Sequence, residues 1–333
     1  MGKKNNVLAW YLNKPSVFAD FCNGCLYEGE KTVLPEELAE VQKANDEVMR
    51  DRNGRLLKKG RERDVVKLLR KNHHFVMIAV ENQDKINYCM PLRCMEYDVA
   101  DFVKQLRRLK NRHKEEGGLE TAEEYLSGMK ETDRLIPIVT ILFYHGKGKW
   151  NAAMRLKDML DPIGMDQRLR RLATDYRMRV VNLEDLKEEY FETGLRELIG
   201  MMKRRESKEE MRKYYENNRE RFCNMDEDTY DLLCTMLDLR SLSGKKKIYR
   251  DAEKETVDMC KAFDDLVKES EMRGEERGKR LGEKQGEKRG EKRGEEKLAS
   301  LIEKLVQDGR MADILAVSQN AQKRKKMYQE YGI

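Results

Sequence analysis

The sequence is constrained most by ten consecutive residues, 135–144 (LIPIVTILFY), which are the most apolar stretch of the chain. Charged residues and hydrophobic residues each make up 39% of the 333 residues, so a core of ordinary size can form despite the high charge content. Branched and aromatic residues favour strands, and Pro137 lies near the start of the run, where a strand tolerates proline. Residues 145–148 (HGKG) follow the run and end the predicted strand. We therefore predict a β-strand over residues 135–144.

Two further β-rich runs precede this segment. Residues 61–69 predict a strand centred on Val65 and Val66, and residues 75–80 (FVMIAV) predict another. Because only the polar residues 71–74 separate them, the two runs indicate an antiparallel hairpin. The spacing of apolar residues predicts helices over residues 17–26 and 91–113 and from Pro35 onward, and residues 177–183 predict a fourth strand. The order of elements is that of an α/β domain with a mixed four-stranded sheet flanked by helices.

The C-terminal part of the chain has a different composition. Residues 186–265 have helical spacing and no strand candidate. Glycine then recurs every four residues from Gly274 to Gly294, among charged neighbours with almost no apolar face. Each interior glycine costs a helix about 1 kcal/mol, so we expect a flexible spacer or a transient, solvated helix there. Residues 298–306 and 311–328 predict short helices.

Several classes of protein are excluded or disfavoured by composition. No apolar run approaches the roughly 18 residues of a membrane span, and the polar N-terminus is unlike a secretory signal. Seven scattered cysteines fit a reducing cytoplasm better than a disulfide framework. The net charge of +6 permits a polyanionic partner without requiring one.

The strongest candidates for a functional site are two acids on the predicted hairpin. Side chains two apart on a strand share a face, so Glu81 and Gln83 project together, and strand pairing could bring Asp64 beside them. Two carboxylates about 4 Å apart repel by roughly 4 kcal/mol at an effective dielectric of 20, so they need a proton or a cation. Hard oxygen ligands suit Mg²⁺ or Mn²⁺. The spacing alone favours ordinary surface residues at the end of a sheet, because an Asp followed by Glu-x-Gln is a short pattern with many accidental matches.

Five short motifs occur in a fixed order along the chain. They are RERDV at 61–65, IAVENQ at 78–83, MPLR at 90–93 followed by Tyr97, LIPIV at 135–139 and YHG at 144–146. With the stretch 17–26 and the glycine-periodic tail, they resemble the recombination-promoting nuclease and putative transposase family, a bacterial branch of the PD-(D/E)XK nuclease superfamily. The specific motifs cover roughly residues 10–185.

This resemblance implies a domain organisation and a set of site residues. It implies a restriction-endonuclease-like core over residues 10–190. Composition and helical spacing divide the rest into a helical region over 191–265, a charged flexible segment over 266–297 and short helices over 298–333. Asp64 and Glu81 correspond to the two acids that hold Mg²⁺ or Mn²⁺, and Asp20 to an acid on the first helix that supports the metal shell. Gln83 stands where the superfamily has lysine, and Arg63 replaces its proline.

The resemblance also implies a function. We expect a metal-dependent endonuclease that hydrolyses DNA phosphodiesters with little sequence specificity, acts in recombination or mobile-element biology, and is cytoplasmic. Gln83 can orient water through its amide but supplies no positive charge. An inactive DNA-binding or interaction protein that keeps the fold is therefore the alternative. Self-association through the C-terminal helices is left open, because one short apolar stripe is a weak oligomerisation signal.

For other candidate residues, a purely structural role stands beside the functional one. Cys22 and Cys25 form a C-x-x-C pair, which a zinc or redox protein could use, but no second such pair occurs and buried helix cysteines are favoured. His145 either approaches phosphate or has a structural role at the end of its strand. Arg93 either contacts nucleic acid or pairs with Glu96.

Overall fold

The computed structural model describes residues 2–41, 48–50, 56–58, 63–161, 166–251 and 253–333. Contacts within the chain divide it into two units, Met1–Ala262 and Phe263–Ile333. The first unit contains the sheet and most of the helices, and the second contains a long helix and two short ones.

A five-stranded mixed sheet forms the centre of the first unit. Its strands follow the order β1-β4-β5-β6-β7. Their bounds are Leu38–Glu40 (β1), Val65–Lys71 (β4), His74–Gln83 (β5), Ile138–Tyr144 (β6) and Arg179–Asn182 (β7). Strand β4 is antiparallel to both of its neighbours, whereas β5, β6 and β7 are parallel. The predicted mixed α/β architecture is confirmed, with one strand more than expected.

The additional strand is β1, where the sequence predicted the start of a helix. A 3₁₀ turn over Pro35–Glu37 is all that forms of that helix. The chain then pairs with β4, with Leu38 opposite Leu69, and the buried Lys67 ammonium forms an ion pair with Glu40. Backbone pairing with a neighbouring strand therefore overrides the local helical signal.

The predicted hairpin is formed by β4 and β5. Lys71 pairs with His74, so the loop has two residues, Asn72 and His73. Both have positive φ angles, 49° and 66°, as a two-residue hairpin turn requires. Residues 61 and 62 of the predicted strand lie outside the described residues.

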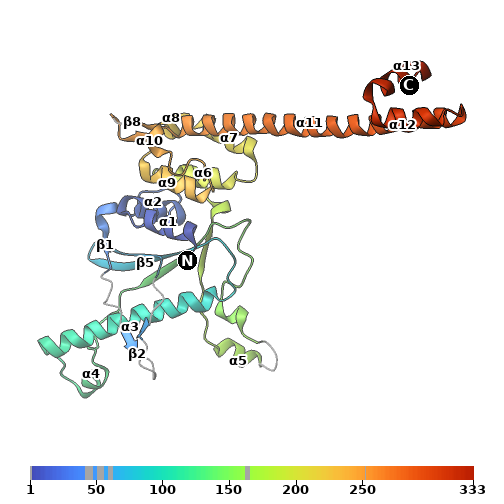
Figure 1. Cartoon of the computed structure of the whole chain (residues 1–333). Coiled ribbons are helices and arrows are strands. Elements are labelled where there is room, and N and C mark those ends of the chain that lie inside the picture. Colours follow the sequence, from blue (N-terminus) through green and yellow to red (C-terminus); the bar gives the residue numbers. More distant parts are fainter. Residues whose placement is uncertain (1, 42–47, 51–55, 59–62, 162–165, 252) are drawn as a thin grey trace. The chain divides into compact units, whose positions relative to one another are not determined.

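Helices cover both faces of the sheet (Figure 1). Helices α1 (Lys3–Leu12) and α2 (Pro15–Leu26) lie on one face, where Phe21 packs edge-on against Phe143 of β6 at 5.2 Å. Helix α3 (Met90–Glu116) lies on the other face. Its Met90 and Cys94 join Leu142, Tyr144 and neighbouring residues in a buried cluster. The predicted helices over 17–26 and 91–113 are thus confirmed.

The rest of the first unit is mainly helical. Its remaining helices are α4 (Ala122–Ser127), α5 (Gln167–Leu172), α6 (Leu195–Lys203), α7 (Lys208–Asn217), α8 (Arg219–Cys223), α9 (Glu227–Met236) and α10 (Lys246–Tyr249). Short strand pairs are β2 (Val48–Arg50) with β3 (Leu56–Lys58), and β8 (Arg250–Asp251) with β9 (Thr256–Val257). The prediction of a wholly helical stretch after residue 186 is wrong at β8 and β9, because two-residue strands are too short for a periodic signal.

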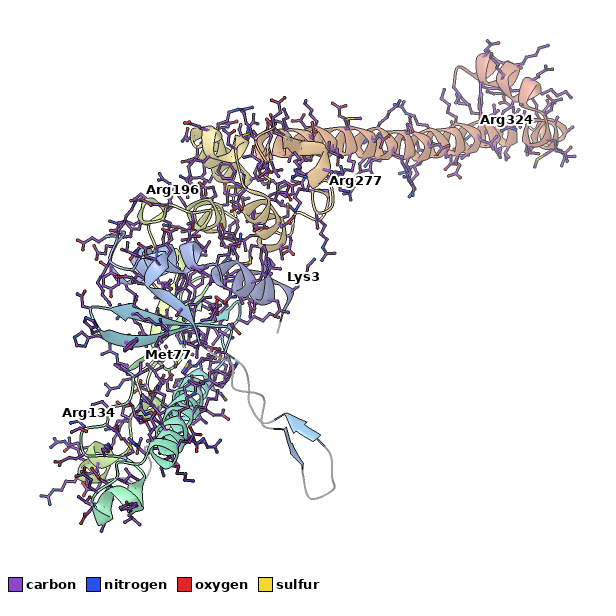
Figure 2. The ribbon with its side chains drawn as sticks, turned by 90° about the vertical axis from the view of Figure 1, so that its left-hand side faces the viewer. Lys3, Met77, Arg134, Arg196, Arg277 and Arg324 are labelled. Atoms are coloured by element: carbon purple, nitrogen blue, oxygen red, sulfur yellow. The ribbon has the colours of Figure 1, made fainter. Side chains whose placement is uncertain are left out.

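Helix α11 (Met259–Gln307) begins in the first unit and continues through the glycine-periodic segment. Of the two states expected there, the structure has the solvated helix, with exposed residues throughout 271–297. Figure 2 shows side chains projecting around this helix, Arg277 among them. After a turn at Gly309, α12 (Met311–Gln319) and α13 (Ala321–Tyr331) pack on its end around Leu301, Leu305 and Val317. Within the described ranges, no helix is long and apolar enough to cross a bilayer.

Candidate metal centre at the open end of the hairpin

Asp64 and Glu81 face one another at the open end of the β4–β5 hairpin. Val65 pairs with Val80, so one step outward along the same register places Asp64 opposite Glu81. Directly opposed residues of antiparallel strands have Cβ atoms about 4.5–5.5 Å apart and project from the same face. The Asn82 amide donates to Oδ2 of Asp64 at 2.8 Å, which fixes this carboxylate across the hairpin.

The Glu81 carboxylate is fully buried and has an unusual environment. Neither of its oxygens has a hydrogen-bond partner among the described residues. Burial, together with the negative charge of Asp64, raises the pKa of Glu81 to about 8, against the opposing effect of Arg63, Arg93 and the Asp64 amide, which lies near the carboxylate without reaching hydrogen-bond geometry. Burial also raises the pKa of Asp64 to about 6, although the bond from Asn82 opposes the shift.

These two carboxylates are suited to a divalent cation. A buried carboxylate without a donor is costly and needs a proton or a cation to compensate it. The Glu81 oxygens are free to coordinate, and carboxylate oxygens are the ligands that Mg²⁺ and Mn²⁺ prefer. Glu81 itself is shielded from water, whereas Asp64, Gln83 and Arg93 are half-buried.

Gln83 and Arg93 complete the surroundings of the acid pair. Gln83 lies two residues beyond Glu81 on β5 and shares its face. Arg93, in the first turn of α3, donates from Nη2 to the Tyr97 hydroxyl at 3.0 Å, and its guanidinium lies 5.7 Å from the centre of that ring. Its positive charge lowers the pKa of both acids. The hydrogen-bond partner of Arg93 is thus Tyr97, whereas the sequence suggested Glu96, and contact with nucleic acid stays a prediction.

Arg63 directly precedes Asp64 and anchors this end of the hairpin to helix α3. Its buried guanidinium donates to Asp98 and Asp101 of α3, both at 2.6 Å, and to Thr140 of β6 at 2.9 Å. Tyr176 donates to the other oxygen of Asp98 at 2.6 Å. Sequence reasoning missed this network. The available signal was the pair of aspartates one helical turn apart on α3, on the side of the helix that faces the sheet.

Asp20 has a different role from the one expected. Its carboxylate accepts hydrogen bonds from the Glu192 and Thr193 amides, both at 2.9 Å, and from the Thr193 hydroxyl at 2.5 Å. Among the interactions of the described residues, none joins Asp20 to Asp64 or Glu81. The expectation that Asp20 supports the metal shell is therefore replaced. Asp20 fixes the chain immediately before α6, and its oxygens are occupied there.

His145 and Cys22 are buried on the opposite face of the sheet, whereas Cys25, the other cysteine of the C-x-x-C pair, is half-buried. The His145 ring lies 5.9 Å from that of Phe143, and burial lowers its pKa to about 4, so the imidazole is neutral. Arg205 donates to the His145 and Gly146 carbonyls, which supports the structural interpretation of this strand end. Cys22 is buried in α2, and burial raises the pKa of its thiol to about 12, which is typical of an inert core cysteine.

A mixed five-stranded sheet with helices on both faces defines an α/β protein. Residues 64–229 match the model of the family described as "Putative transposase, YhgA-like". Over these residues the chain belongs to that family, as the motifs predicted. The match begins at Asp64 and includes β4 to β7, α3 and the helices up to the start of α9. No curated protein and no solved structure matches the chain significantly.

Proposed function

We propose that this protein is a metal-dependent endonuclease that hydrolyses DNA phosphodiester bonds in mobile-element biology. The observation that carries the proposal is the Glu81 carboxylate, which is buried, lacks a hydrogen-bond donor and lies opposite Asp64. Membership of a transposase-like family supports DNA as the partner and mobile elements as the setting.

Each residue of the site has a distinct task in this proposal. Asp64 and Glu81 would hold Mg²⁺ or Mn²⁺ between the two strands. When bound, such an ion lowers the pKa of water and offsets negative charge on a phosphodiester. The Gln83 amide, on the same face as Glu81, orients the attacking water by accepting or donating a hydrogen bond.

Arg93 supplies the positive charge that Gln83 lacks. Its electrostatic effect reaches both acids, and Tyr97 holds one end of its guanidinium. A guanidinium can pair with two phosphate oxygens at once, so Arg93 is suited to stabilise charge that develops on the scissile phosphate. The missing lysine of strand β5 is thereby compensated from helix α3.

The test is plasmid nicking in Mg²⁺, compared with nicking in a chelator. We expect Asp64→Ala and Glu81→Gln to abolish cleavage, while Glu96→Gln, which removes an exposed carboxylate from α3, leaves it unchanged. Calorimetry with Mn²⁺ should detect one site that Glu81→Gln removes. Unchanged nicking by Asp64→Ala would overturn the assignment. Absence of a Glu81-dependent metal site would instead identify a binding protein that keeps the fold.

The division of labour between Gln83 and Arg93 has its own test. Gln83→Lys should preserve or raise cleavage, because it restores the superfamily's cation beside the metal. Arg93→Met should reduce cleavage at least tenfold, and Arg93→Lys should reduce it less. A complete loss of activity in Gln83→Lys, with normal folding, would contradict the role given to the amide.

A further inference from the structure

A second group of metal-ligating side chains lies away from the acid pair, where α8 ends and α11 begins. The sulfurs of Cys223 and Cys260 are 2.7 Å apart. One carboxylate oxygen of Asp258 lies with them, all three donor atoms being within 4.8 Å of one another. In the part of the chain that the structure describes, no other cluster of three His, Cys, Asp or Glu donors meets this criterion.

The backbone holds these three residues in place from both sides. Met225 and Val257 form an antiparallel bridge, with N–H···O bonds of 3.2 and 2.7 Å. The Asp258 amide donates to the Tyr249 carbonyl at 2.9 Å. One oxygen of Asp258 accepts from the Lys261 amide at 3.0 Å in the first turn of α11. The donors therefore converge because the loop after α8 and the start of α11 are joined. The other oxygen of Asp258 lies 3.4 Å from the ammonium of Lys261, an exposed side chain whose ion pair a bound cation would replace.

The chemistry of the cluster differs from that of the acid pair. Cys260 is fully buried, whereas Cys223 and Asp258 are half-buried and leave an approach from solvent. Burial and the hydrogen bond with Cys223 raise the pKa of the Cys260 thiol. Thiolates are soft ligands that select zinc over magnesium, which prefers oxygen.

We propose that Cys223, Cys260 and Asp258 bind one Zn²⁺, with solvent as the fourth ligand. Binding replaces the two thiol protons, which pass to solvent, with two Zn–S bonds of about 2.3 Å, and adds one Zn–O bond of about 2.0–2.2 Å. Tetrahedral bonds of that length place the two sulfurs about 3.8 Å apart, so they must separate by about 1 Å. We expect Cys223 to make this movement, because it is half-buried at the end of the five-residue helix α8 whereas Cys260 is buried.

The site would tie α8 to the first turn of α11 within the first unit. It does not depend on the proposed nuclease, because its residues are separate from Asp64 and Glu81 and its metal differs. A disulfide between Cys223 and Cys260 would need an oxidant and would not involve the Asp258 carboxylate, whereas zinc uses all three donors.

The test uses the full chain, reduced and freed of metal, and titrated with Co²⁺ and then Zn²⁺ alone. We expect one Co²⁺ per chain, with a thiolate-to-cobalt charge-transfer band that an equivalent of Zn²⁺ abolishes. Cys223→Ser and Cys260→Ser should each weaken binding at least tenfold, whereas Cys89→Ser, which changes an exposed cysteine outside the cluster, should not. Asp258→Asn should weaken binding about tenfold and keep the helix cap, since asparagine caps as well as aspartate.

Two results would overturn the proposal. One is a wild-type chain without the charge-transfer band. The other is a peptide map of the unreduced protein that joins Cys223 to Cys260 by a disulfide, which would identify an oxidisable pair instead. Circular dichroism of each variant separates loss of a ligand from loss of the fold. Magnesium-dependent nicking should be retained in Cys223→Ser.

Discussion

The buried carboxylate of Glu81 should make the stability of the first unit depend on pH. Its pKa is raised from 4.5 to about 8, first by burial and then by the charge of Asp64. Between these values the folded state holds a proton that the unfolded chain has lost, so the free energy of unfolding falls as pH rises. A shift of this size corresponds to roughly 4–5 kcal/mol lost between about pH 4.5 and pH 8.

Replacing Glu81 with glutamine removes this dependence with little change of volume. We expect the wild-type chain to lose about 4 kcal/mol more than Glu81→Gln between pH 4.5 and pH 8.5, with the difference developing mostly above pH 5. Both tryptophans, Trp10 and Trp150, lie in the first unit, so urea unfolding followed by tryptophan fluorescence reports on that unit. Glu96→Gln, with an exposed carboxylate, is the matched control and should keep the wild-type pH dependence.

Mn²⁺ provides a second measurement on the same pair of proteins. A cation between Asp64 and Glu81 favours the ionised carboxylates, so it should restore stability to the wild type at pH 8 and leave Glu81→Gln unaffected. If the unfolding free energies of wild type and Glu81→Gln stayed parallel from pH 4.5 to pH 8.5, the Glu81 carboxylate would not be held in a protonated, donor-free environment, and the reasoning would fail.

Three further substitutions test the packing and the ion pairs. Arg63→Ala should lower the free energy of unfolding by about 3–5 kcal/mol in urea, because it leaves Asp98 buried without its cation; a loss below about 1 kcal/mol would contradict the network. Gly24→Ala places a methyl group 2.3 Å from the Phe191 ring, so we expect a loss of about 1–3 kcal/mol in the same assay. Gly286→Ala meets nothing within 4 Å and should raise the helix content of α11 by circular dichroism, at about 1 kcal/mol of helix propensity; an unchanged helix signal would argue against a helix there.

The central strands were predictable because their signals are local. The runs that became β5 and β6 are continuous, branched and apolar, and the short polar link before β5 indicated the hairpin. Strand β1 was not predictable, because its three residues carry no periodic pattern and depend on pairing with β4. The same reason applies to β8 and β9, each of two residues.

In the candidate sites too, only the residues whose placement depends on local sequence were predictable. Asp64 and Glu81 could be placed together from the strand pattern, since hairpin register follows from the sequence. The role of Asp20 was mistaken because its partners, Glu192 and Thr193, lie 172 and 173 residues away along the chain. The contact between Cys223 and Cys260 crosses 37 residues and matches no spacing motif.

The anchoring of helix α3 connects the electrostatics of the site to the fold. Arg63 is bonded to Asp98 and Asp101, so its charge is largely offset by α3. Arg93 lies in the first turn of α3, before the two aspartates, and its hydrogen bond is to the neutral hydroxyl of Tyr97. Of these two arginines, Arg93 therefore has the greater charge available to a phosphate. Helix α3 thus positions Arg93 and also holds Arg63, the residue before Asp64, so the cation and the acid are placed by the same element.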